Sequence, residues 1–178
     1  MRELKNVVEI LRHARHDWLN QLQLIKGNLE LGKTNRAKEI IDELIIDARN
    51  ESNLSNLGLD EFSSLLLTCN WKQHYFRLEY EVLEATGTFP LEDQEITGWM
   101  NHLFLYLEES FDPQGENHVF ISIEVLAEWT RLLFEVRGEF LPNANILTFI
   151  HTHPLKKGTV HLIDELEDEL TFEIMIRE

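Results

Sequence analysis

The segment from Val7 to Leu31 reads VVEILRHARHDWLNQLQLIKGNLEL, and its pattern decides the first element of the fold. Its apolar residues recur every three or four positions, which is the spacing of one face of an α-helix. With Leu4 just before it, this face comprises Leu4, Val7, Leu11, Ala14, Trp18, Leu22, Ile25 and Leu29. Because each helical residue turns about 100°, His16 lies roughly 150° from the centre of the face. The sequence therefore predicts a long helix that buries its apolar face, Trp18 included, and exposes the imidazole of His16.

A second amphipathic helix follows after a short turn. Gly32 can end the first helix in the left-handed conformation that residues with a Cβ avoid, and helical spacing resumes from Arg36 to Leu54. Two long helices joined by a tight turn lie antiparallel. Such a hairpin leaves apolar surface uncovered, so we expect two copies of the chain to form a homodimer with a four-helix bundle. The alternative is that the C-terminal part of the same chain covers the hairpin.

The residues beyond Asp60 show a different pattern, with short apolar runs that alternate as half-buried strands do. The expected helices span residues 61–74 and 91–111, the expected strands span 77–83, 118–126, 131–136, 159–163 and 170–176, residues 146–151 form a short helix or a turn, and the acidic residues 164–169 form a solvated turn. We therefore predict the fold class α+β, with one sheet covered by helices. The expected domains are a helical hairpin at residues 1–57 and an α+β domain at residues 58–178.

Composition excludes several classes of function. The 178 residues carry a formal net charge of −16, which argues against nucleic acid as a direct partner. Residues 1–38 nevertheless hold 8 Lys and Arg against 4 Asp and Glu, whereas residues 39–178 hold 8 against 28. An acidic partner would therefore be steered toward the end of the chain that contains His16. No apolar run reaches the length of about 18 residues that a membrane span needs.

Cysteine and the remaining histidines offer little chemistry. The single cysteine, Cys69, lies in an apolar run and cannot form an internal disulfide, which fits a reducing cytoplasm and an inert core position. The charged N-terminus leads directly into a helix, so we expect no signal peptide and a cytoplasmic location. His151 and His153 resemble a metal-binding pair, but no Cys or acidic cluster adjoins them and Pro154 follows. We interpret them as part of a surface loop.

The residues around His16 suggest a phosphoryl carrier. An exposed imidazole on a rigid helix can be aligned in line with an incoming phosphoryl group, and transfer needs little else beyond charge neutralisation. Asp17 could orient the ring or accept its proton. Arg15 could attract an acidic partner or contact phosphate oxygens. Asn20, one helical turn beyond His16, could contact the incoming group.

Residues 12–57 read RHARHDWLNQLQLIKGNLELGKTNRAKEIIDELIIDARNESNLSNL. This run resembles the helical hairpin of the sporulation initiation phosphotransferase B family, as do Cys69-Asn70-Trp71-Lys72 and residues 78–83. The resemblance implies a four-helix bundle followed by a domain similar to a histidine-kinase ATP-binding domain that has lost its nucleotide site. It also implies that His16 receives phosphate from the aspartyl phosphate of a single-domain response regulator. His16 then passes the phosphate to a second regulator, a sporulation transcription factor. The chain would need no cofactor of its own, because the regulator supplies Mg²⁺ and a Lys.

Three other functions compete with this interpretation. A related sensor histidine kinase core would need an Asn-rich helix, a DxGxG element and a glycine-rich lid. Here residues 101–109 read NHLFLYLEE, with Leu or Phe where the kinase pattern has its metal-binding Asn. Residues 137–140 read RGEF and do not form a DxGxG element. The stretch after them holds one glycine, Gly158, which is too few for a glycine-rich lid. A regulator phosphatase could use the spacing of Asp17 and Asn20 to orient an attacking water. A dimeric docking protein would leave His16 incidental.

Overall fold

The computed structural model describes residues 2–142 and 146–177, with side chains from residue 7 onward. The expected contribution of the Leu4 side chain therefore lies outside the described residues. The chain forms two compact units, Met1–Arg49 and Asn50–Glu178. The described helices include none long and apolar enough to cross a membrane.

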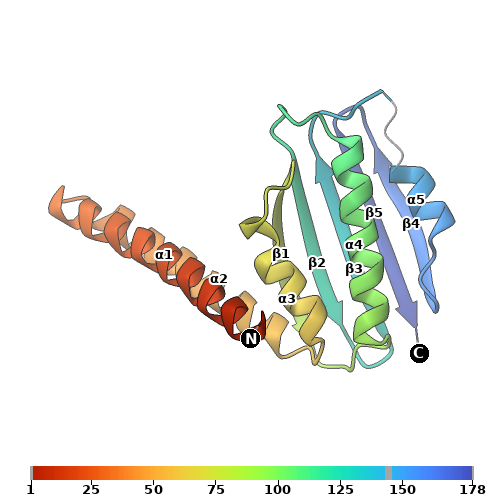
Figure 1. Ribbon diagram of the computed structural model, residues 1–178, viewed down its shortest axis with the longest axis horizontal. Helices are drawn as coiled ribbons and strands as arrows, with labels where there is room; N and C mark the ends of the chain where they lie inside the picture. Colours follow the sequence, from red (N-terminus) through yellow and green to blue (C-terminus); the bar gives the residue numbers. More distant parts are fainter. Residues whose placement is uncertain (1, 143–145, 178) are drawn as a thin grey trace. The chain divides into compact units, whose positions relative to one another are not determined.

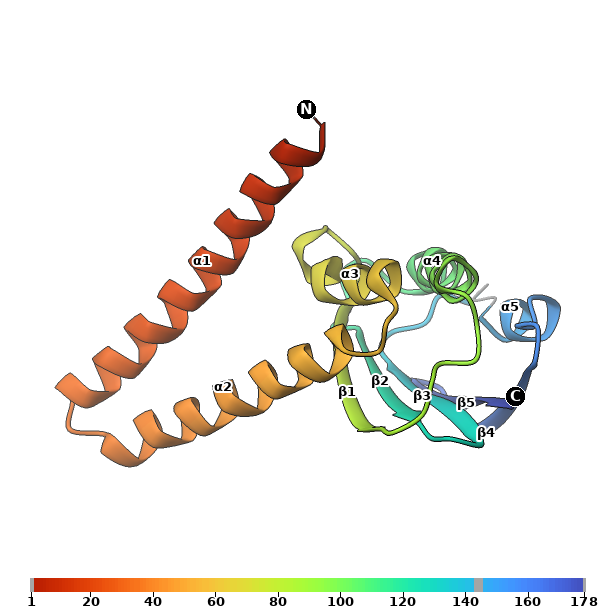
Figure 2. The ribbon, with the colours of Figure 1, turned by 90° about the horizontal axis from the view of Figure 1, so that it is seen from below.

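The first unit is a helical hairpin. Helix α1 (Arg2–Glu30) ends at Gly32, whose φ is +70°. The Lys33 amide donates to the Asn28 carbonyl at 2.8 Å and the Gly32 amide donates to the Leu29 carbonyl at 3.0 Å, which satisfies carbonyls that the helix end leaves open. Helix α2 (Thr34–Ser55) then returns, and the two helices spread apart with distance from the turn (Figure 2). The predicted hairpin is confirmed.

The apolar face of α1 is not buried within the single chain, as expected for a lone hairpin that leaves apolar surface uncovered. Five large side chains of that face are 51% to 59% exposed: Val7, Leu11, Trp18, Leu22 and Leu29. Ala14 and Ile25 are partly covered; on α2, Ala37 and Ile40 are buried within the first unit, and Leu54 is buried in the second. The physical reason is that α2 spreads away from α1 beyond the turn, so it covers little of the wide apolar stripe (Figure 2).

The second unit is one five-stranded sheet with helices on one face (Figure 1). Its strands lie in the order β1 (Arg77–Ala85), β2 (His118–Val125), β3 (Trp129–Arg137), β5 (Glu169–Arg177) and β4 (Gly158–Glu165). Strands β1 and β2 are parallel, as a crossover through a helix requires, and the other neighbours are antiparallel. The covering helices are α3 (Asp60–Thr68), α4 (Asp93–Ser110) and α5 (Ile146–Thr152). The expected α+β class is confirmed.

The core of this unit lies between the sheet and its helices. Alternate residues of each strand point inward, as the burial of Leu132, Phe134 and Val136 on β3 shows. Phe134 stacks on Phe172 of the neighbouring strand, with ring centroids 4.6 Å apart. From the opposite layer α4 contributes a buried apolar stripe: Ile96, Met100, Leu103, Phe104 and Leu107.

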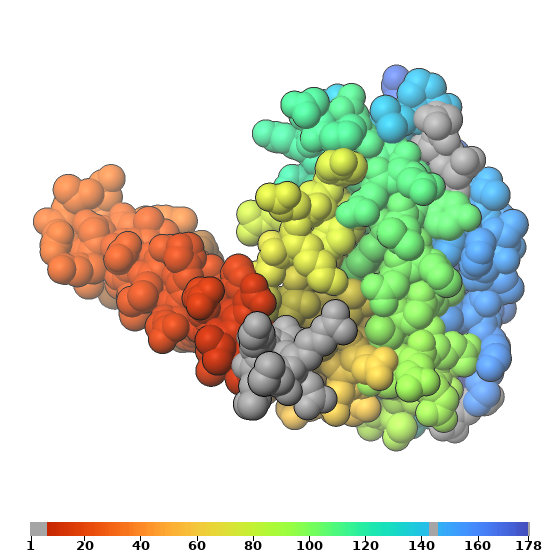
Figure 3. All heavy atoms as spheres, viewed as in Figure 1, coloured from red at the N-terminus to blue at the C-terminus, as the bar shows by residue number. Residues whose placement is uncertain are grey.

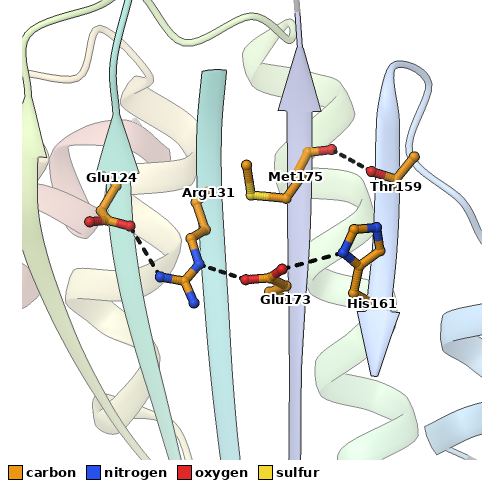
Figure 4. Close-up of polar contacts among 6 residues, drawn as sticks. All are labelled: Glu124, Arg131, Thr159, His161, Glu173 and Met175. Atoms are coloured by element: carbon orange, nitrogen blue, oxygen red, sulfur yellow. Dashed lines mark hydrogen bonds and ion pairs between the residues drawn. The ribbon is translucent and has the colours of Figure 1, made fainter. Parts of the chain in front are cut away.

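The outer face of the sheet is a network of cross-strand charges (Figure 4). Arg131 on β3 donates to Glu173 on β5 at 2.6 Å and to Glu124 on β2 at 3.4 Å. His161 on the edge strand β4 lies 3.3 Å from the same Glu173 carboxylate. The hydrogen bond that Arg131 donates to Glu173, followed by the negative charge of that carboxylate, raises the pKa of Arg131. These charged groups of the outer face therefore pair across the strands.

Most element boundaries lie within two residues of the predicted ones, and the largest difference is at the end of α3. The helix expected at residues 61–74 ends at Thr68 and continues as a single 3-10 turn, η1 (Cys69–Trp71). The Asn70 amide exchanges two hydrogen bonds with the backbone of Leu78, at 2.7 and 2.9 Å, and this tie to β1 stops the helix. In the expected acidic turn at residues 164–169, Asp164 and Glu165 complete β4 because they pair with Thr171 and Leu170 of β5. Glu169 opens β5 because it pairs with Arg137 on β3.

Candidate functional site

His16 lies near the middle of α1 with its side chain 72% exposed. The helix holds the imidazole in place because hydrogen bonds fix the backbone over several turns before and after His16. A long helix is a rigid support, so the ring position varies only through its own side-chain torsions. The structure therefore places His16 where a macromolecular partner can reach it, as the helical spacing predicts.

Both polar neighbours of His16 contact the same ring nitrogen. The Asp17 carboxylate lies 3.3 Å from Nδ1, and the amide nitrogen of Asn20 lies 3.2 Å from Nδ1. Within the described part of the chain, no hydrogen bond or ion pair involves Nε2. The arrangement therefore anchors the ring through Nδ1 and leaves Nε2 open to an incoming electrophile.

Arg15 is exposed beside His16 but takes no part in the contacts of Asp17 and Asn20 with the ring. Its guanidinium forms no ion pair with a side chain that the structure describes. The nearest basic pair on the same helix, Lys26 with Glu30 at 3.6 Å, lies further along the surface. Of the four residues proposed from the sequence, the structure brings together His16, Asp17 and Asn20 and leaves Arg15 alongside.

The sequence interpretation missed one feature near the site. Trp18 and Leu19 are both about half exposed. Leu19, three residues from His16, flanks the polar group on the helix surface, whereas Trp18 lies on the apolar face opposite the imidazole. Exposed apolar surface of this kind marks protein interaction sites in soluble proteins. The signal was present in the sequence, but the helical pattern assigned Trp18 to a core that one chain does not form.

The other histidines and the cysteine do not form a second site. The described residues contain no group of three or more His, Cys, Asp or Glu arranged to hold a metal ion. His151 and His153 each bond within α5 and its end, through Nδ1 to the Leu147 carbonyl and to the Thr152 hydroxyl. Burial raises the pKa of the Cys69 thiol to about 12, so it stays protonated and unreactive at neutral pH.

The space between α4 and α5 is filled by side chains of the chain itself. The ring centroids of Tyr106 and Phe149 lie 4.9 Å apart, and His153 stacks on Phe149 at 4.8 Å. The Trp99 indole donates to the His153 carbonyl at 2.7 Å and locks the end of α5 onto α4. In the space-filling view, the helices cover the facing side of the sheet (Figure 3). The inward face of α4 is apolar.

Comparison with known families decides the relationship. Residues 58–177 match the family model described as sporulation initiation phospho-transferase B, C-terminal. Residues 1–57 match the model of the sensor kinase SpoOB-type, alpha-helical domain. The chain belongs to the sporulation initiation phosphotransferase B family.

Individual relatives extend this picture. The sporulation initiation phosphotransferase B of Bacillus subtilis (strain 168) is 44% identical over 118 residues, which are 66% of this chain and 62% of that protein. The aligned part of the chain therefore spans less than two thirds of that relative. Among solved structures, the Acinetobacter baumannii histidine kinase AdeS is 14% identical with a TM-score of 0.42, covering 91% of this chain and 97% of its own. The nucleotide-free catalytic domain of histidine kinase ThkA is 11% identical with a TM-score of 0.45, covering 70% and 94%.

Proposed function

We propose that this chain is a histidine phosphotransferase of a bacterial sporulation phosphorelay. Nε2 of His16 takes a phosphoryl group from the aspartyl phosphate of a single-domain response regulator. It then passes the group to the Asp of a second regulator, a sporulation transcription factor. The observation that carries this proposal is the exposed His16 ring, anchored through Nδ1 and open at Nε2. Family membership and the 44% identity to a sporulation phosphotransferase support it.

The residues around His16 have separate roles in this proposal. Asp17 orients the ring and balances the charge that develops on it. Arg15 attracts the acidic face of a regulator, which fits the excess of basic residues in the first 38 positions. The regulator supplies Mg²⁺ and a Lys to neutralise the transferring group, so this chain needs no cofactor of its own. Both regulators work in the cytoplasm, and we place this chain there with them.

We further propose that the chain works as a homodimer in which two hairpins form a four-helix bundle. The support is the open apolar face of α1, because a stripe of this length is costly to leave in water. Pairing with a second copy would cover it and would put two His16 side chains on the surface of one bundle. Each regulator would then dock on helices from the hairpins.

Self-phosphorylation from ATP is not part of the proposal. The kinase elements for holding nucleotide are replaced in this sequence at three places, at residues 101–109, at residues 137–140 and in the stretch beyond them. The aromatic cluster of Trp99, Tyr106, Phe149 and His153 occupies the space between α4 and α5. Phosphate must therefore reach His16 from another protein.

The test mixes the chain with a single-domain regulator that carries a labelled aspartyl phosphate, in the absence of ATP. We expect acid-labile, base-stable label to move onto this chain and to disappear in His16→Ala. His13→Ala, one turn away on the same helix, is the matched control and should still accept label. Labelling of the wild-type chain directly from ATP would overturn the proposal in favour of a kinase.

A regulator phosphatase is the second candidate, because Asp17 and Asn20 do lie beside the ring. Such an enzyme positions a water against the regulator's phosphate and needs no phosphohistidine. Persistent release of free phosphate from the regulator by His16→Ala would favour it. Loss of both transfer and release in that variant would favour the carrier.

A further inference from the structure

The two contacts at Nδ1 of His16 require opposite protonation states. The Asp17 carboxylate can only accept, so its 3.3 Å contact requires a proton on Nδ1. The amide nitrogen of Asn20 can only donate, so its 3.2 Å contact requires a lone pair on Nδ1. One nitrogen cannot satisfy both at once. The two neighbours therefore select two different forms of the ring.

Each form suits a different stage of a phosphoryl carrier. With Nδ1 protonated by the Asp17 contact, the lone pair lies on Nε2, which is then a nucleophile. With Nδ1 bare and bonded to Asn20, Nε2 holds a proton or a phosphoryl group. A phosphorylated imidazole with a bare Nδ1 is neutral in its ring and leaves slowly, because it must depart as an anion. The same group with Nδ1 protonated departs as neutral imidazole.

We propose that Asn20 is a positioning residue that stores the phosphate on His16, by donating its amide to Nδ1 of the phosphorylated ring. Asp17 holds the empty ring ready for phosphate, and the two residues alternate at Nδ1. This inference rests on the proposed carrier role of His16 and goes beyond it, because it assigns uptake and storage to different neighbours.

During uptake, the Nε2 lone pair forms a bond to phosphorus. The phosphorus–oxygen bond to the regulator's Asp breaks, and its electron pair stays on the carboxylate. The ring then carries one positive charge, and the Nδ1 proton passes through Asp17 to solvent. The freed Nδ1 lone pair accepts the hydrogen bond from Asn20. Onward transfer reverses this order, since a proton returns to Nδ1 before the imidazole leaves.

The experiment uses the full chain with ¹⁵N-labelled histidine and two readouts. In the unphosphorylated protein, ¹⁵N spectra report whether Nδ1 or Nε2 holds the proton. The protein is then phosphorylated with potassium phosphoramidate, which needs no regulator, and ³¹P spectra follow the decay of phosphohistidine. His16→Ala identifies the signals that belong to His16. Gln23→Glu, an exposed amide-to-carboxylate change further along α1, is the matched control for Asn20→Asp.

The inference predicts an order of lifetimes. Asn20→Ala should shorten the life of phosphorylated His16 about fivefold, the factor of one ordinary hydrogen bond. Asn20→Asp should shorten it further, because a carboxylate favours a proton on Nδ1. Before phosphorylation, Asn20→Asp should raise the fraction of His16 with Nδ1 protonated, and Gln23→Glu should change neither readout.

Three results would overturn the inference. An unchanged ¹⁵N spectrum in Asn20→Asp would mean that the amide presents its oxygen to the ring. A longer phosphohistidine life in Asn20→Ala would mean that Asn20 assists hydrolysis. An unchanged lifetime in both variants would mean that Asn20 does not act on the ring. A different outcome would overturn the proposed function itself: Asn20 lengthens the life of phosphorylated His16, but His16 takes no label from any regulator.

Discussion

Cys69 is a buried thiol whose ionisation the fold suppresses. Burial raises the pKa of Cys69 from 9.0 to about 12. As pH rises, the unfolded chain therefore loses this proton before the folded chain does. The stability linked to the thiol is fully present below about pH 9 and is lost as pH rises toward the folded value. We expect the free energy of unfolding to fall by up to about 1.4 kcal/mol per pH unit in this window, as measured by urea unfolding.

The control for this prediction is Cys69→Ala. That variant should be less stable at every pH, because it leaves a small cavity in a completely buried position. Above pH 9 its stability should decline less steeply than that of the wild-type chain. Parallel curves for the two proteins would contradict the assigned cause.

Thr130 at the start of β3 presents a buried hydroxyl that finds no hydrogen-bond partner among the described residues. Valine has nearly the same shape, favours strands and removes the unsatisfied oxygen. We expect Thr130→Val to raise the free energy of unfolding by about 1 kcal/mol. Thr171→Val, on the half-exposed outer face of β5, should change it little. A less stable Thr130→Val would show that the hydroxyl is bonded in solution.

At the candidate site, the sequence alone predicted that His16, Asp17 and Asn20 lie together but not how they contact one another. Positions 16, 17 and 20 fall on one side of a helix by spacing, since residues four apart are neighbours on its surface. That both Asp17 and Asn20 meet Nδ1 depends on side-chain torsions that the pattern does not specify. The contacts, and the opposite demands that they make, came only from the three-dimensional arrangement.

Among the elements, α1 contains Gly27 and is followed by Gly32, and these two glycines have opposite requirements. Gly32 ends the helix at a φ of +70°, whereas Gly27 lies within the helix and a Cβ there would meet no atom within 4 Å. We expect Gly32→Ala to destabilise the chain by about 1 kcal/mol, because a Cβ is strained in the left-handed region. Gly27→Ala should instead stabilise it by up to about 1 kcal/mol. Thermal unfolding followed by circular dichroism measures both, and shifts of the same sign would refute this explanation.

The end of α3 shows why element boundaries are harder to predict than element types. Helical periodicity continues past Thr68, yet the chain leaves the helix there because Asn70 bonds to the backbone of Leu78. That contact joins positions eight residues apart across a turn, and no local propensity encodes it. By contrast, the strand boundaries of the second unit were predicted to within two residues, because alternation along a strand is a local pattern.

For the whole molecule, the open apolar face of α1 leads to a direct test of the proposed homodimer. Leu22→Glu places a charge where a second hairpin would pack, and a buried unpaired charge is costly. We expect sedimentation to show a dimer for the wild-type chain and a monomer for this variant at micromolar concentration. Leu105→Glu, an equally exposed leucine on α4, should leave the dimer intact. A monomeric wild-type chain would contradict the proposal.

The sequence by itself determined the helical hairpin, the α+β class and the exposure of His16, because these depend on periodicities of a few residues. Only the tertiary structure decided the strand order β1-β2-β3-β5-β4, the filling of the space between α4 and α5, and the contacts at Nδ1. Trp18 illustrates the difference. Residue spacing alone places Trp18 on the apolar stripe of α1. Its burial depends on a partner surface distant in sequence, and one chain does not provide that surface.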